Sequence, residues 1–222
     1  MKRLLSLLLL IATSQTLKGQ DQRFHFGLKV IPSMAWIKPD TKEAEREGRS
    51  FGFGYGVQTE FKLQENYVIS SGVQVNYRGG SLKHTYKPVD TLAAVTGTVD
   101  YKLQYIEIPV TLKMLTNPFN KIRYYGQFGF SPGVAIRSKT DPGITPDDDD
   151  FIDYTNMFNM NMIIGAGIHY TLSGTTVLFA GIEFNNGFIN IFDKDSKDLP
   201  WSADGKIKGV TNYLGLSTGV LF

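Results

Sequence analysis

The stretch GVTNYLGLSTGVLF (residues 209–222) ends the chain, and in it large apolar residues alternate with small or polar ones. One parity holds Val210, Leu214, Leu216, Val220 and Phe222, and the other holds Thr211, Tyr213, Gly215, Ser217 and Gly219. Because successive side chains of a β-strand point to opposite faces, this alternation predicts a strand with one apolar face. The strand is long enough for the roughly 9–11 residues with which a tilted strand crosses a bilayer.

The same alternation recurs through most of the chain, in segments rich in Gly, Tyr, Phe, Val and Thr. These residues favour strands over helices, so the sequence predicts an all-β fold. The predicted strands are eight: 24–37, 51–63, 66–79, 98–114, 121–137, 156–171, 175–188 and 208–222. Several exceed the roughly five or six residues usual in soluble sheets.

Short and long connections alternate between these strands. The short ones lie near Gln64-Glu65, at 117–120 and at 172–175, and the long ones span about 38–50, 80–97, 138–155 and 189–207. Bacterial outer-membrane barrels combine short periplasmic turns with longer extracellular loops. The sequence therefore predicts an eight-stranded antiparallel up-and-down transmembrane β-barrel with both ends of the barrel domain on the periplasmic side. A soluble periplasmic barrel of lipocalin type is the alternative, because alternation alone does not say which face points inward.

The amino-terminal residues have the pattern of a secretory signal. Met1-Lys2-Arg3 is cationic, Leu4 to Ala12 is apolar, and a polar stretch leads to Gly19 and Gln20. The apolar run is about half the roughly 20 residues of a membrane-spanning helix. We expect a cleaved signal peptide over 1–19, a barrel domain over 20–222, and residence in the outer membrane of a Gram-negative bacterium.

Charge and cysteine content exclude several classes of protein. Residues 1–19 contain three of the 23 bases and none of the 21 acids, so the mature chain has 20 bases against 21 acids. Nucleic-acid binding normally needs a strong basic excess and is not expected. The absence of cysteine excludes disulfides, thiolate metal sites and a lipid attached at a cysteine.

Polar residues on the parity opposite to the apolar face predict what fills the barrel. Eight strands leave an interior just wide enough to be filled by side chains, and buried charges need partners. We expect a salt-bridged plug with no pore, formed by Lys29, Glu60, Lys62, Arg78, Lys102, Glu107, Arg123 and Glu183, with Lys113 on the same parity.

Two local features of the predicted strands stand out. Aromatic residues gather toward strand ends, among them Phe24, Trp36 and Tyr124, as in the aromatic girdles of membrane barrels. In segment 98–114 the apolar residues change from odd positions to even positions near 105–106. This change predicts a β-bulge in that strand, and Pro109 predicts a second interruption.

No catalytic motif is present, and no cofactor is expected. The three histidines are His25, His84 and His169, and they belong to no HExxH, GxSxG or phosphate-binding pattern. We expect no enzymatic activity; a lipid-modifying barrel enzyme that uses His84 and nearby loop acids is the alternative. The weak candidates for a cation site are Asp147, Asp148, Asp149 and Asp150, a run that more often forms a solvated loop.

Part of the sequence resembles a known family. The segment Tyr105-Ile106-Glu107-Ile108-Pro109-Val110-Thr111-Leu112-Lys113, with Tyr124 to Gly129 and Pro132-Gly133 after it, resembles the central hairpin of the PorT-like outer-membrane β-barrel family of Bacteroidetes, as does Phe26-Gly27-Leu28-Lys29. The resemblance implies an eight-stranded outer-membrane barrel and supplies no catalytic residues. The family's namesake belongs to a secretion system.

The expected partners follow from this assignment. They are outer-membrane lipid, other envelope or secretion-system proteins, and the barrel-assembly machinery during biogenesis. Phe222 resembles the aromatic terminal signal that this machinery recognises in its clients.

Overall fold

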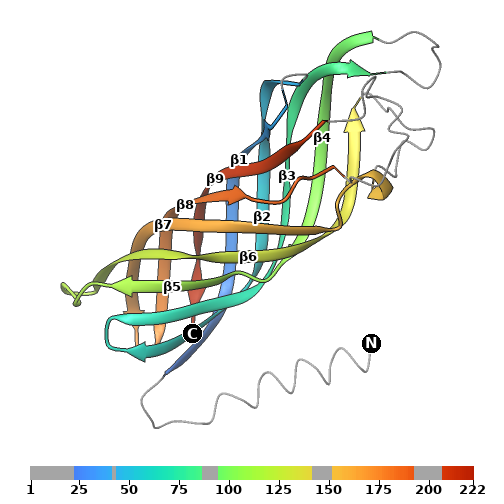
Figure 1. Cartoon of the computed structure of the whole chain (residues 1–222). Helices are drawn as coiled ribbons and strands as arrows, with labels where there is room; N and C mark the ends of the chain where they lie inside the picture. The colour runs from blue at the N-terminus through green and yellow to red at the C-terminus, as the bar shows by residue number, and fades with distance from the viewer. Residues whose placement is uncertain (1–22, 42–43, 87–94, 142–151, 193–206) are drawn as a thin grey trace, which may run out of the picture.

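The computed structural model describes residues 23–41, 44–86, 95–141, 152–192 and 207–222. These residues form an antiparallel β-barrel, drawn in Figure 1. Its strands are β1 (Phe24–Pro39), β2 (Glu45–Gln64), β3 (Tyr67–Tyr86), β4 (Val95–Glu107), β5 (Val110–Leu115), β6 (Ile122–Asp141), β7 (Phe158–Ser173), β8 (Thr176–Gly187) and β9 (Gly209–Leu221). A short 3-10 turn, η2 (Ile152–Tyr154), precedes β7. No helix in these ranges is long and apolar enough to cross a membrane.

The nine strands make eight passes of a closed ring. Strands β4 and β5 both pair with β3 and with β6, so they are two parts of one pass. They are separated at Ile108-Pro109, because proline has no N–H to donate to the ladder. Strand β9 pairs with β1 and closes the ring. The predicted eight-stranded up-and-down barrel is confirmed, and Pro109 interrupts the fourth pass as expected.

The tight connections and the two ends of the barrel lie at one end, which we call the turn end. The β2–β3 turn, the β7–β8 turn at Gly174, the start of β1 and the end of β9 all lie there. Gly174 has a φ of +58°, a conformation that favours glycine. We call the opposite end, where β1, β3, β6 and β8 end, the loop end.

Large apolar side chains cover the outside of the barrel. Between the turn end and roughly the middle of the long strands, nearly every outward position is apolar and exposed, including Phe26, Leu28, Val57, Ile69, Val73, Leu112, Phe128, Ile164, Ile168, Ile182, Leu214 and Leu216. A soluble barrel has the opposite arrangement, with its apolar face inside, so the lipocalin-type alternative is wrong. This band is the surface that faces lipid in a membrane barrel.

Strands β2, β3 and β6 continue past this apolar band at the loop end. Each has 20 residues, which at about 3.4 Å per residue and a tilt of about 40° span about 50 Å along the barrel axis. The lipid-facing band of such barrels is only about 25 Å tall. Residues 45–50, 79–86, 95–104 and 137–141 therefore form a segment, which we call the extension, that rises above the band. Figure 1 shows β3 and β4 reaching furthest at this end.

The extension has the apolar-inside pattern of a soluble barrel. Its interior contains Leu82, Val99, Tyr101 and Leu103, and Tyr105 of β4 lies next to them just below the extension; all five are at most 3% exposed. Ile37 of β1 and Ile191, Phe192 and Ile207 from the loop segments pack into the same cluster. The cluster forms an apolar cap over the barrel interior.

The predicted bulge in the fourth pass is wrong, because β4 does not change phase. Its odd positions from Val99 to Glu107 all point inward. What changes is the medium outside: Lys102 lies beyond the apolar band, and Ile106 lies within it. The apolar residues therefore lie on the inward face in the extension and on the outward face in the band, although no residue is inserted into β4. A register shift does occur here, but the extra residue is Ile136 of β6, since Gln104 and Tyr105 pair with Arg137 and Ala135.

Candidate functional site

Three buried ion pairs cross the barrel interior in the described part of the chain. They are Lys29–Glu183, Arg78–Glu107 and Lys113–Glu60, and each side chain is at most 9% exposed. The strands place them at successive levels, with Lys113–Glu60 near the turn end and Arg78–Glu107 below the apolar cap. Six of the charges that the parity pattern assigned to the interior thus neutralise one another inside the barrel.

Glu107 is the centre of the largest polar network. It is fully buried, and Arg78 Nη2 lies 2.8 Å from its Oε1. Three amides also donate to this carboxylate: Gln74 at 2.9 Å, Asn161 at 3.0 Å and Asn76. Both carboxylate oxygens therefore have donors. The guanidinium of Arg78 also lies 4.3 Å from the ring centroid of Tyr105, so it links the network to the apolar cap.

The other two pairs are also supported by neighbouring side chains. Tyr213 Oη donates to Glu183 at 2.9 Å, beside the Lys29 ammonium. Gln58 donates to Glu60 at 2.9 Å, and His169 Nε2 lies 3.8 Å from the same carboxylate. The Lys113 ammonium lies 4.9 Å and 5.2 Å from the ring centroids of Tyr125 and Phe179. Aromatic and charged side chains together fill this cross-section.

The remaining members of the predicted network lie elsewhere. Lys62 and Arg123 line a depression of about 240 Å³ at the turn end, with His25, Glu60 and His169. Arg123 donates to the backbone carbonyls of Thr116 and Glu65 and so holds two turns together. The expectation that Lys102 points inward is wrong: its side chain is 63% exposed and pairs with Asp141 on the outer face at 3.3 Å. In the extension, the strand positions that carry polar side chains point outward.

The histidines form no reactive constellation with an acid and a nucleophile in the described ranges. His84 is 2% exposed inside the extension, where its Nε2 lies 2.9 Å from Tyr101 Oη. Burial lowers the pKa of His84 and raises the pKa of Tyr101. No group of three or more His, Asp or Glu side chains with the geometry of a metal site occurs among these residues. The acidic run Asp147 to Asp150 lies outside them.

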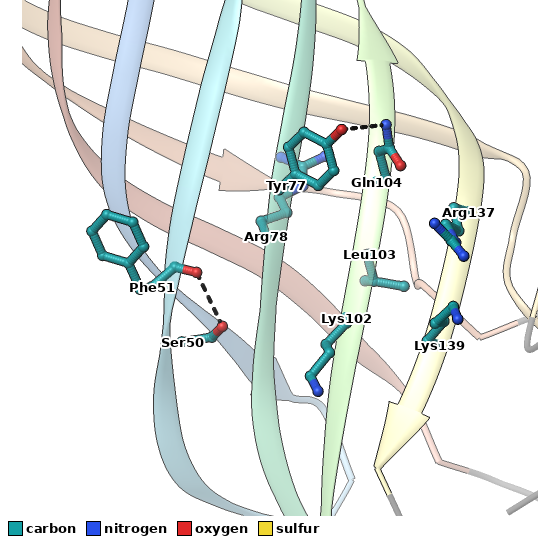
Figure 2. A pocket seen from close by; sticks show the side chains of 9 residues that line it. All are labelled: Ser50, Phe51, Tyr77, Arg78, Lys102, Leu103, Gln104, Arg137 and Lys139. Atoms are coloured by element: carbon teal, nitrogen blue, oxygen red, sulfur yellow. Dashed lines mark hydrogen bonds between the residues drawn. The ribbon is translucent and has the colours of Figure 1, made fainter. Parts of the chain in front are cut away.

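A basic groove lies on the outer wall where the apolar band meets the extension (Figure 2). Its volume is about 480 Å³, and it crosses β2, β3, β4 and β6. Four cationic residues line it: Lys102, Arg137, Lys139 and the buried Arg78. Phe51 and Tyr77 border it toward the band. Gln104 Nε2 donates to Tyr77 Oη at 3.0 Å across the part of the groove nearest the band. The sequence reasoning missed this groove, because it placed Lys102 inside and did not use Arg137 or Lys139.

The closed ring, the lipid-type outer face and the filled interior define a small outer-membrane β-barrel. The family model for the outer membrane protein beta-barrel domain matches residues 13–193, and the chain belongs to this family. No curated protein sequence matches the chain.

Solved structures of several outer-membrane proteins are similar to this chain. Neisserial surface protein A (NspA) is 14% identical with a TM-score of 0.50, over 90% of this chain and 97% of that chain. OprG from Pseudomonas aeruginosa is 9% identical with a TM-score of 0.42, over 90% and 94%. The outer-membrane protease OmpT from Escherichia coli is 8% identical with a TM-score of 0.45, over 94% and 99%. At 14% identity the likeness to NspA concerns the fold alone.

Proposed function

We propose that this protein is a non-conducting, non-enzymatic outer-membrane barrel that presents its extension and loops to other components of the cell envelope. The observation that carries the proposal is the combination of a filled interior with strands that continue beyond the apolar band. Three buried ion pairs and an apolar cap fill the path that solutes would take. We therefore expect other molecules to bind at the outer surface of the extension.

The outer surface of the extension has the composition of a binding surface exposed to water. Glu45, Arg46, Glu47 and Lys83 are exposed on β2 and β3, so charges of both signs lie side by side. Complementary charges steer association and select partners more than they add raw affinity. A partner with its own mixed charges fits this surface better than an apolar one.

A finer form of this proposal makes the partner an envelope or secretion-system protein, as in the PorT-like family. Its support is the resemblance of the segment from Tyr105 to Lys113, together with Pro132-Gly133 of the neighbouring strand. Export by a cleaved signal peptide over 1–19 and recognition of Phe222 by the barrel-assembly machinery complete the proposed route to the membrane.

Conductance tests the first half of the proposal. The purified barrel, inserted into planar bilayers, should give no current steps above those of the bilayer alone, because the interior is filled. Stable channel openings by the unaltered protein would contradict a non-conducting role.

Site-specific cross-linking in intact cells tests the second half. A photoreactive residue at Thr98, exposed on the extension, should give discrete protein adducts. The same residue at Ile164, inside the apolar band, serves as the matched control and should give lipid adducts only. If Thr98 yields no protein adduct in the native envelope, the extension does not present a protein-binding surface.

A further inference from the structure

The depression at the turn end is lined by polar side chains that the strand register brings together. His25 of β1 is the register partner of Glu60 of β2. Arg123 of β6 is likewise the partner of His169 of β7. Lys62 lies two positions from Glu60 on the same face of β2, nearer to the turn. These side chains from four strands therefore surround one hollow of about 240 Å³.

Two of these side chains carry positive charges that no acid neutralises in the described part of the chain. The ammonium of Lys62 has no hydrogen-bond or ion-pair partner there. Arg123 donates through Nε and Nη2 to three uncharged oxygens, which are the backbone carbonyls of Thr116 and Glu65 and the side-chain amide of Asn66. Its Nη1 has no acceptor among the same residues. The hollow thus offers two cations to an anion that enters from this end.

Two hydrogen-bonding atoms that border the hollow also lack partners. Gln58 and Lys113 both bind Oε1 of Glu60, so Oε2 has no donor within the described ranges. His169 is only 6% exposed, and its Nε2 makes no hydrogen bond, since it lies 3.8 Å from Oε1 of Glu60. Buried polar groups in native proteins nearly always have a partner. A ligand that carries both negative charge and a hydroxyl would provide these missing partners.

We propose that the turn-end depression binds inorganic phosphate in its hydrogen-phosphate form. Lys62 and the Nη1 group of Arg123 donate to its charged oxygens, in hydrogen bonds that are strengthened by charge. The phosphate hydroxyl donates to Oε2 of Glu60, and a further phosphate oxygen accepts from Nε2–H of His169. This inference goes beyond the proposed function, which concerns the loop end, because the turn end of such barrels faces the periplasm.

The carboxylate of Glu60 makes the depression selective among anions. Sulfate carries no hydroxyl near neutral pH, and a phosphate monoester, with a second pKa of about 6, has lost its last one at pH 8. Their oxygens would face Oε2 of Glu60 with no proton between them. Inorganic phosphate keeps one hydroxyl at this pH, so the free ion is preferred over a phosphorylated molecule.

Isothermal titration calorimetry of the detergent-solubilised full barrel at pH 8 tests affinity and selectivity. Inorganic phosphate should bind, and sulfate and glycerol phosphate should each bind at least about tenfold more weakly, because a charged hydrogen bond is replaced by repulsion. Lys62→Gln should lower the affinity for phosphate about tenfold. Lys121→Gln changes an exposed lysine at the same end that does not line the depression, so it is the matched control and should change nothing.

NMR of the histidine ring nitrogens locates the bound ion in the unaltered protein, which has three histidines. Phosphate should shift the signals of His25 and His169 and leave that of His84, at the loop end, unchanged. No binding of phosphate, equal binding of sulfate, unchanged affinity in Lys62→Gln, or a shift confined to His84 would each overturn the proposal. Heat-modifiable migration in gels confirms that both variants are folded.

Discussion

Replacing Glu107 by Gln tests whether buried ion pairs hold the barrel interior together. The substitution keeps the shape of the side chain and leaves the charge of Arg78, which is 3% exposed, without its counterion. Removing one partner of a buried pair costs about 3–5 kcal/mol. With a urea dependence of about 2 kcal/mol per M, the unfolding midpoint should fall by about 2 M. Urea unfolding of the reconstituted barrel, followed by far-UV circular dichroism, measures this shift.

A double-mutant cycle and an exposed control sharpen the test. Arg78→Met combined with Glu107→Gln should recover at least about 2 kcal/mol relative to the sum of the single variants, because no unpaired charge remains. Asp141→Asn breaks the Lys102–Asp141 pair, whose side chains are 63% and 68% exposed, and should cost less than about 1 kcal/mol. If Glu107→Gln costs no more than Asp141→Asn, the interior pairs do not stabilise the fold as argued.

Three other predictions concern the seam, the extension and the terminus. Gly27→Ala should lower the free energy of unfolding by about 1–3 kcal/mol in the same urea assay, because a Cβ there would lie 1.8 Å from the Val220 carbonyl oxygen at the closing seam. Gly126→Ala, where a Cβ would meet open space, is the control and should leave it unchanged. Burial lowers the pKa of His84, so as the pH falls this histidine is protonated in the unfolded chain before it is protonated in the folded one. The free energy of unfolding should therefore fall as the pH drops below about 6.5. His84→Gln should reduce the difference between the urea midpoints at pH 8 and pH 5.5. Phe222→Ala retains the backbone bonds to Phe26 but should lower the amount of barrel assembled in cells, measured by heat-modifiable migration; unchanged assembly would remove Phe222 as a signal.

The strands could be predicted from the sequence because a period of two is a local property. Residues such as Val57 and Phe61 alternate with Gln58 and Glu60, and this pattern defines both the strand and its two faces. The alternation of short and long connections then orders the strands into a barrel. The outer face could not be assigned from alternation alone, since soluble and membrane barrels share the pattern.

The predictions for β4 were wrong because the medium around this strand changes along its length. Within β4 the side chains keep their parity, but the strand passes from lipid at Ile106 to water at Lys102. The apolar residues therefore change faces, and the sequence pattern looks like an inserted residue. The same effect placed Lys102 inside, although its side chain is 63% exposed. Only the three-dimensional height of the apolar band distinguishes these cases.

The partners of the interior charges were also beyond sequence reasoning. Parity placed Glu107 and Arg78 on the inward face, but their pairing depends on the stagger between β3 and β4 and on the reach of each side chain. Asn161, which donates to Glu107 from β7, is 54 residues away in the chain. Contacts across a barrel depend on its closure, which no local pattern encodes.

Accessibility of single cysteines in intact cells tests the central claim most directly, and the chain offers a clean background because it contains no cysteine. A membrane-impermeant maleimide should label Thr98→Cys and Lys83→Cys on the extension in intact cells. Glu65→Cys, at the turn end, should be labelled only after permeabilisation, and Phe128→Cys, in the apolar band, should resist labelling in both conditions. Labelling of Glu65→Cys in intact cells, or protection of Thr98→Cys, would contradict a filled outer-membrane barrel whose extension rises on the outer side.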